Sequence, residues 1–268
     1  MINKAQTVNL PMLRQMKQQG EKIAVLTAYD ASFARLMDSN GIDIILVGDS
    51  LGMVIQGHDS TLPVSMNDMV YHTANVARVV QRAMIMADMP FMSFSSTDRA
   101  LTNAGRLMQE GGAHIVKIEG GGDFVPVVQA LSRHGIPVCA HLGLLPQSVH
   151  KLGGYRVQGK DPDTAGTMVK DAMAMQEAGA ELLLLECVPA ALGAEISGQL
   201  QIPVIGIGAG AACDAQVLVL QDMLGMTLGK QPKFSRNFLS GQDGIAQAIA
   251  AYAQAVKSGT YPTADHSY

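Results

Sequence analysis

The feature that most constrains the fold is a recurring unit, in which a helix-like segment, a glycine and a short apolar run follow one another. In one such unit ASFARLMDSNG precedes IDIILVGD, and in another TMVKDAMAMQEAG precedes AELLLLE. Glycine after a helix supplies the left-handed C-cap that turns the chain back. Because the apolar runs are continuous rather than alternating, they are typical of strands covered on both faces. Such strands in alternation with helices predict a parallel sheet.

The number of apolar runs predicts closure into a (β/α)8 TIM barrel. Eight strand candidates lie near residues 23–28, 43–48, 83–88, 113–118, 136–141, 181–186, 202–207 and 216–221. An open doubly wound sheet is the alternative, but the glycine fingerprint it would carry after its first strand is missing. The interval between the last two runs is short for a full helix. Since 268 residues match the usual size of one barrel, we expect residues 1–268 to form a single domain with an extra N-terminal helix.

Composition excludes several classes of partner. The net charge of −4 and the scattered basic residues give no electrostatic basis for binding nucleic acid or an anionic membrane. No apolar run approaches membrane-spanning length, and the first residues lack the apolar stretch of a signal peptide. Cys139, Cys187 and Cys213 are odd in number and lack the spacing of a zinc site or redox pair. They suit small buried side chains in a reducing compartment, so we expect a cytoplasmic protein.

Polar and charged residues stand at the ends of the apolar runs, where an apolar core would not place them. They are Tyr29, Asp30, Asp49, Ser50, Asp88, Lys117, Glu119, His141 and Glu186, with Asp222 as a secondary candidate after the eighth run. A parallel barrel builds its active site at the carboxyl ends of its strands. The sequence therefore predicts one active site assembled from distant parts of the chain.

Three of these residues predict a metal site. Asp49, Asp88 and Glu119 would be neighbours on the rim because they end three successive strands. Three such anions repel and raise each other's pKa, and a bound divalent cation removes this repulsion. A few oxygen ligands suit Mg²⁺, which keeps positions open for water and substrate. Any one carboxylate alone is at least as well explained as a helix cap or ion-pair partner, but three on successive strands favour a metal.

The remaining charges predict proton abstraction next to a carbonyl. Lys117 and Glu119 are two apart in one strand, so both point into the barrel, where Lys117 can hold a substrate carboxylate or oxyanion. A Schiff base or a purely structural ion pair are the alternatives for this lysine. Glu186 ends an apolar strand, and desolvation gives it the poise of a general base. His141, between the two groups, either donates a hydrogen bond to a developing anion or is simply an internal histidine.

Several motifs carry a resemblance to one family. They are TAYD (27–30), LVGDSLGMVIQGHDSTLPV (46–64), YHT (71–73), ADMPF (87–91), VKIEGG (116–121), AHLGLLPQSV (140–149), GGYRVQGK (153–160), LECVP (185–189) and IPVIGIGAG (202–210). Together they resemble the ketopantoate hydroxymethyltransferase family. The resemblance covers nearly the whole chain, and its second motif is long and highly specific.

This resemblance implies a barrel of the phosphoenolpyruvate/pyruvate type and a specific reaction. The expected reaction is hydroxymethyl transfer from 5,10-methylenetetrahydrofolate to 3-methyl-2-oxobutanoate, the first committed step of pantothenate synthesis, through a Mg²⁺-stabilised enolate. It also implies a homodecamer of two pentameric rings. By residue, it implies Asp49 and Asp88 as metal ligands with Glu119 as the third metal-associated carboxylate, Asp49, Ser50, Asp88 and Lys117 as 2-oxo acid contacts, Glu186 as base, and Tyr29 and His141 as further pocket residues.

Two other functions remain as alternatives. A lyase or mutase of the same barrel superfamily would use similar enolate chemistry, but such enzymes often carry a cysteine-bearing lid after the fourth strand. Here that position reads GGGDF (120–124), without cysteine. A non-catalytic barrel that binds a metabolite would keep the glycines and lose the charges at the strand ends, whereas this chain has both.

Overall fold

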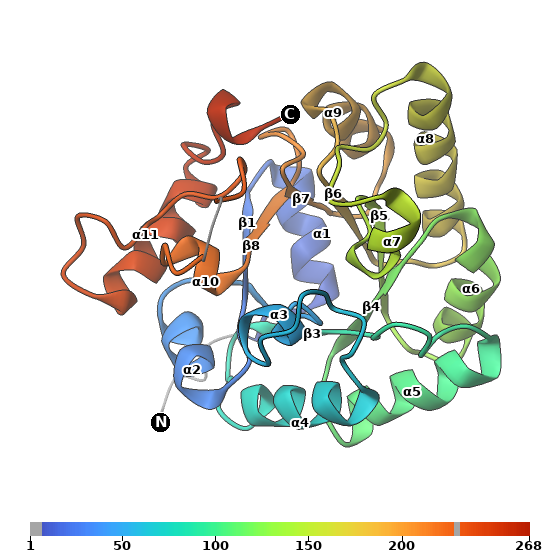
Figure 1. The fold of residues 1–268 in the computed structure, drawn as a ribbon, viewed down its shortest axis with the longest axis horizontal. Coiled ribbons are helices and arrows are strands. Elements are labelled where there is room, and N and C mark those ends of the chain that lie inside the picture. The colour runs from blue at the N-terminus through green and yellow to red at the C-terminus, as the bar shows by residue number, and fades with distance from the viewer. Residues whose placement is uncertain (1–6, 228–230) are drawn as a thin grey trace.

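The computed structural model describes residues 7–227 and 231–268, which form a closed barrel of eight parallel strands (Figure 1). The strands are β1 (Ile23–Thr27), β2 (Ile44–Val47), β3 (Met84–Asp88), β4 (Ile115–Glu119), β5 (Val138–Gly143), β6 (Leu182–Glu186), β7 (Val204–Ile207) and β8 (Ala215–Leu218). They follow one another around the barrel in sequence order, and β1 pairs with β8. The predicted (β/α)8 barrel is confirmed.

Helices surround this barrel. They are α1 (Leu10–Gln19), α2 (Ala31–Ser39), α3 (Leu51–Val54), α4 (Met66–Ala77), α5 (Thr97–Gln109), α6 (Val125–Arg133), α7 (Val149–Leu152), α8 (Pro162–Glu177), α9 (Ala190–Gln199), α10 (Leu220–Met223) and α11 (Ile245–Lys257). Figure 1 shows the longer helices around the ring of strands and α1 near its middle. No helix in the described ranges is both long and apolar enough to cross a membrane.

Two separate layers of apolar side chains fill the molecule. Strand residues such as Ile44 and Met86 point inward and pack together inside the barrel, and Leu13 of α1 joins this inner cluster. Helix α1 is therefore the extra N-terminal helix predicted from the sequence, and it packs on the barrel interior. Val116 and Ile118 belong to the outer layer between strands and helices. This alternation leaves the intervening Lys117 and Glu119 inside the barrel, as predicted.

The last strand differs from expectation. Strand β8 ends at Leu218 and α10 begins at Leu220, so Asp222 lies on a short helix rather than at a strand end. Its carboxylate accepts a hydrogen bond from the hydroxyl of Thr227. Between β7 and β8 there is no helix, in agreement with the short interval. Asp30 is also a local structural residue, because its carboxylate caps α2 by accepting hydrogen bonds from the backbone N–H groups of Ser32 and Phe33.

Candidate active site

The carboxyl ends of β2 to β6 bring the predicted residues together. Asp49, Asp88, Lys117, Glu119 and His141 are all 2–4% exposed. The side chain of Glu186 is 16% exposed at the end of β6. Three acids, one lysine and one histidine in a buried space form an electrostatic cluster, with the partly exposed Glu186 at its rim. The helical and loop segments that follow these strands lie over this end of the barrel.

Lys117 is the central cation of the cluster. Its Nζ lies 3.1 Å from Asp88 Oδ1, 3.9 Å from Glu119 Oε1 and 3.2 Å from His141 Nδ1. Burial alone disfavours the ammonium, but the carboxylates of Asp88, Glu119 and Asp49 outweigh burial and raise the pKa of Lys117. The amine is therefore protonated at neutral pH, which disfavours a Schiff-base role and suits binding of an anionic group.

Asp49 and Asp88 are held next to each other by a bond between adjacent strands. The backbone N–H of Asp49 donates to Asp88 Oδ2 at 3.0 Å. A side chain at Gly48 would place its Cβ 2.8 Å from Ser50 Oγ and 3.5 Å from Asp88 Oδ2, so glycine permits this close approach. Burial raises the pKa of Asp49 well above its usual value, and the charges of Asp88 and Glu119 raise it further.

Gln147 is a site residue that the sequence argument missed. Its backbone N–H donates to Glu119 Oε2 at 3.0 Å, and its side-chain Nε2 donates to Asp49 Oδ2 at 2.8 Å and to the Met89 carbonyl at 3.0 Å. One buried residue from the connection after β5 thus joins the ends of β2, β3 and β4. Gln147 is uncharged and lies in a loop, so the search for charged strand ends passed over it. Its place in the AHLGLLPQSV motif was the available signal.

His141 connects Lys117 with Glu186 and is neutral. Burial lowers the pKa of its imidazole well below the usual value, and the neighbouring ammonium of Lys117 lowers it further. Lys117 can only donate, so Nδ1 of His141 accepts and the ring proton must be on Nε2. This Nε2 lies 3.4 Å from Glu186 Oε2 and makes no hydrogen bond within the described chain. His141 is therefore a donor directed at Glu186.

Glu186 has the environment of a general base. Burial raises the pKa of its carboxyl to about 8, although Lys117 opposes part of this effect. Glu119 is likewise raised to about 8 by burial, but it accepts the Gln147 N–H and faces Lys117. Glu186 makes no comparable hydrogen bond within the described residues. Of the two acids, Glu186 is therefore the one free to exchange a proton with a substrate.

Tyr29 and Ser50 form a hydroxyl pair beside the charged cluster. Tyr29 Oη lies 2.9 Å from Ser50 Oγ, and the tyrosine is 2% exposed. Burial raises the pKa of Tyr29, so its hydroxyl is neutral. His72 Nδ1 lies 2.7 Å from the Tyr29 carbonyl, which ties α4 to the end of β1. These neutral hydroxyls can contribute hydrogen bonds to a ligand but no charge.

The carboxylates of Asp49 and Asp88 fit a site for one Mg²⁺, and Glu119 as its third carboxylate stays a prediction. Within residues 7–227 and 231–268, no three His, Cys, Asp or Glu side chains converge into a metal cage. Asp88 Oδ1 forms an ion pair with Lys117 Nζ at 3.1 Å, and Asp49 has one oxygen beyond the bond from Gln147. Mg²⁺ commonly takes one or two carboxylates together with water and substrate oxygens. Asp49 and Asp88 suit that requirement, and Glu119 keeps one oxygen, Oε1, beyond the bond that its Oε2 accepts from the Gln147 N–H.

The raised pKa of Glu186 predicts how stability depends on pH. The folded protein holds the Glu186 proton up to about pH 8, whereas an unfolded glutamic acid releases it near pH 4.5. Unfolding therefore releases a proton between these values, and this group's contribution to stability falls as pH rises through that window. Glutamine does not titrate, so Glu186→Gln does not lose stability in this way as pH rises.

We therefore compare the free energy of unfolding of Glu186→Gln with that of wild type. From pH 5 to pH 9 this difference should grow in favour of the variant by on the order of 2–4 kcal/mol, at about 1.4 kcal/mol per pKa unit. Urea denaturation in metal-free buffer measures the difference. Because other acids titrate equally in both proteins, a difference independent of pH would contradict the raised pKa.

The fold and the site together define a (β/α)8 TIM barrel with a cluster of charged side chains at the carboxyl ends of its strands. Its fold is similar to that of phosphonopyruvate hydrolase (TM-score 0.61, 15% identity, 82% of this chain and 83% of that one). It is also similar to that of 2,3-dimethylmalate lyase, which is a PEP mutase/isocitrate lyase superfamily member (TM-score 0.58, 17% identity, 78% of this chain and 80% of that one). These similarities confirm the predicted (β/α)8 fold.

Sequence comparison then gives the family. The sequence profile of ketopantoate hydroxymethyltransferase matches residues 7–264. The 3-methyl-2-oxobutanoate hydroxymethyltransferase of Nitrosococcus oceani is 58% identical over 261 residues, which cover 97% of this chain and 99% of the relative. The enzyme of the same name from Alkalilimnicola ehrlichii is also 58% identical, over 97% of this chain and 94% of the relative. The chain belongs to the ketopantoate hydroxymethyltransferase family, which confirms the resemblance.

Proposed function

We propose that this protein transfers a hydroxymethyl group from 5,10-methylenetetrahydrofolate to 3-methyl-2-oxobutanoate, giving ketopantoate and tetrahydrofolate. The observation that carries the proposal is the arrangement across the barrel mouth. An acidic pair and a protonated lysine, Asp49, Asp88 and Lys117, come from the ends of β2, β3 and β4, and Glu186 with its raised pKa comes from the end of β6. Asp49, Asp88 and Lys117 suit the binding of an α-keto carboxylate. Glu186 suits removal of the acidic proton on the carbon next to the keto group. Curated relatives more than half identical carry the matching name.

The residues divide the binding of the 2-oxo acid between charge and hydrogen bonds. Lys117 provides a fixed ammonium for the negative charge of the substrate, and Ser50 provides a hydroxyl oriented by Tyr29. Asp49 and Asp88 would hold one Mg²⁺, which when bound would stabilise negative charge that develops on the keto oxygen. Gln147 fixes the rotamer of Asp49 and closes this side with the loop after β5.

Glu186 starts the bond-forming step. Its ionised form removes the proton from C3 of 3-methyl-2-oxobutanoate, and the Nε2–H of His141 stabilises the base from behind. The resulting carbon nucleophile bonds to the methylene carbon of the folate donor. The bonds from the methylene carbon to the two folate nitrogens break, and water supplies the hydroxyl oxygen of the product. The overall balance is one 2-oxo acid, one methylene donor and one water for one ketopantoate and one tetrahydrofolate.

The reaction is tested directly with the purified protein. We expect stoichiometric formation of ketopantoate from 3-methyl-2-oxobutanoate and 5,10-methylenetetrahydrofolate in the presence of Mg²⁺, measured by mass spectrometry. Label from a [¹³C]methylene donor should appear in the hydroxymethyl carbon. Turnover without the folate, or absence of label in the product, would contradict the proposed donor.

Asp88→Asn tests the proposed Mg²⁺ site. We expect the variant to bind 3-methyl-2-oxobutanoate at least ~10-fold more weakly than wild type when Mg²⁺ is present, because an amide is a much poorer ligand for this hard cation. Without Mg²⁺ the two proteins should differ much less. Isothermal titration calorimetry with and without EDTA measures both values, and Asp163→Asn on the exposed start of α8 is the control. An equal loss with and without the metal would count against ligation.

A further inference from the structure

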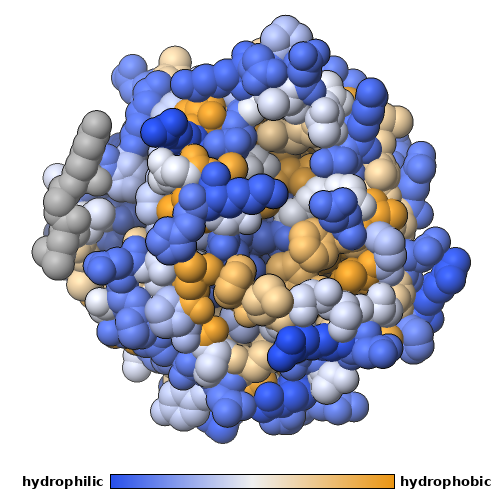
Figure 2. All heavy atoms as spheres, turned by 45° about the vertical axis from the view of Figure 1, so that its right-hand side comes forward, coloured by the Kyte–Doolittle hydropathy of each residue, from blue (hydrophilic) through white to orange (hydrophobic). Residues whose placement is uncertain are grey.

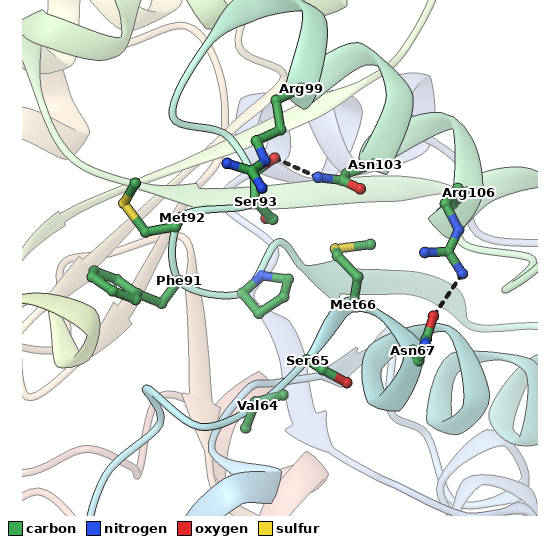
Figure 3. A pocket seen from close by; sticks show the side chains of 11 residues that line it. Val64, Ser65, Met66, Asn67, Phe91, Met92, Ser93, Arg99, Asn103 and Arg106 are labelled. Carbon is green, nitrogen blue, oxygen red and sulfur yellow. Dashed lines mark hydrogen bonds between the residues drawn. The ribbon is translucent and has the colours of Figure 1, made fainter.

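A pocket of about 410 Å³ is lined in part by the residues that follow β3, and the proposed reaction does not use it (Figure 3). Its walls are the end of the β2–α4 connection, the β3–α5 connection and the first half of α5 with Arg106. The lining residues are Val64, Ser65, Met66, Asn67, Pro90, Phe91, Met92, Ser93, Arg99, Asn103 and Arg106. The pocket therefore joins an apolar wall to a wall of amides and guanidinium groups.

One wall of the pocket is continuous with the strand that carries Asp88. Pro90 follows Asp88 by two residues, and Met92 follows it by four. Four residues of extended chain span at most about 14 Å, so the pocket begins within one small molecule's length of the reacting centre. The carbonyl of Met89 also accepts a hydrogen bond from Gln147, which anchors this segment to the site.

The polar wall has a guanidinium and a hydroxyl group that form no ion pair or hydrogen bond with any described residue. Arg106 is occupied, because its guanidinium bonds to Glu110 and to Asn67 Oδ1. The guanidinium of Arg99, by contrast, has no ion pair or hydrogen bond within residues 7–227 and 231–268. Ser93 is 5% exposed, and its hydroxyl has no hydrogen-bond partner in the same part of the chain. A buried hydroxyl without a partner costs free energy unless a ligand or water supplies one.

The apolar wall suits an aromatic group. Phe91 is 46% exposed and Met92 is 51% exposed, so two large apolar side chains face solvent at the pocket. Met92 also has a φ of 63°, a left-handed conformation that is uncommon for a side chain of this kind and is found disproportionately at functional sites. Large apolar side chains also gather in the middle of the face seen in Figure 2, with hydrophilic ones around them.

We propose that this pocket binds the p-aminobenzoyl-glutamate part of the folate donor. The inference rests on the proposed function and adds a location for the second substrate. In 5,10-methylenetetrahydrofolate the reactive carbon adjoins the aminobenzoyl ring, and the glutamate is at the far end of the molecule. Phe91 and Met92 cover the ring, Arg99 pairs with a glutamate carboxylate, and Ser93 bonds to a polar atom between them.

Arg99→Met tests the carboxylate contact. The variant keeps the apolar stem and loses the charge at an exposed position, so its fold should be unaffected. We expect the KM for 5,10-methylenetetrahydrofolate to rise about 10- to 100-fold, the range for loss of a charged hydrogen bond, while the KM for 3-methyl-2-oxobutanoate changes less than about 3-fold. Arg35→Met, an equally exposed arginine on α2, is the matched control.

A binding measurement separates this inference from the proposed function. Wild type should bind p-aminobenzoyl-L-glutamate more tightly than p-aminobenzoate in calorimetry, and the difference should disappear in Arg99→Met but persist in Arg35→Met. Normal folate-dependent turnover with an unchanged folate KM in Arg99→Met would overturn the pocket assignment and leave the function standing. A wild-type protein with no folate-dependent turnover would instead overturn the proposed function. A change in oligomeric mass without a change in folate KM would identify the pocket as a contact with a second copy and would also overturn the assignment.

Discussion

Glu186→Gln should slow exchange of the C3 proton of 3-methyl-2-oxobutanoate by about 10²- to 10⁴-fold, the usual contribution of a positioned general base. Glutamine keeps the size of the side chain and can still contact His141, but it cannot take up a proton. In wild type, exchange should rise with pH until Glu186 is ionised, near its pKa of about 8. Proton NMR in D₂O with Mg²⁺ and without folate measures this step alone.

A control variant and a binding measurement show whether an effect of Glu186→Gln is specific to proton removal. Glu177→Gln removes an exposed carboxylate from α8 and should exchange at the wild-type rate. Calorimetry should show that Glu186→Gln still binds the 2-oxo acid, because the proposed charged contacts come from β2, β3 and β4 and remain in place. Undiminished exchange in Glu186→Gln would remove Glu186 from the role of base, and loss of both exchange and binding would make it a binding residue.

Lys117→Met should destabilise the fold by about 3–5 kcal/mol, the usual effect of removing one partner from a buried ion pair. Lys117 is 4% exposed and is the cation between Asp88 and Glu119. Without it, the buried carboxylates must stay charged without a partner or bind protons. The second option becomes easier as pH falls, so the loss of stability should be larger at pH 9 than at pH 5.

Urea denaturation of metal-free protein at both pH values measures the effect of Lys117→Met. Lys160→Met is the control, because Lys160 is exposed and a surface substitution of this kind is usually within about 0.5 kcal/mol of wild type. Overall turnover of Lys117→Met should also be lost, since no other cation faces the 2-oxo acid among the described residues of the cluster. A stable and active Lys117→Met protein would show that the lysine is dispensable both for packing and for substrate binding.

The barrel and the inward direction of its charges were predictable because both depend on local pattern. Continuous apolar runs between helices specify buried parallel strands, and residues two apart in a strand share a face, as for Lys117 and Glu119. The end of β8 was less predictable. The apolar run continues past Leu218 into α10, and a short apolar run cannot by itself distinguish a strand from a helical turn.

What the sequence determined by itself was therefore which residues lie at the carboxyl ends of the strands and which chemical types they bring there. Only the tertiary structure decided how they pair. The contact of Gln147 with Asp49 spans 98 positions, and the proton on His141 Nε2 follows from a lysine on the neighbouring strand. Arg99 and Ser93, whose side chains have no partner within the described residues, likewise become meaningful only where the β3–α5 connection meets α5. Strand direction and facing follow from short-range geometry, whereas hydrogen-bond partners and pKa shifts depend on distances between segments that the fold alone brings together.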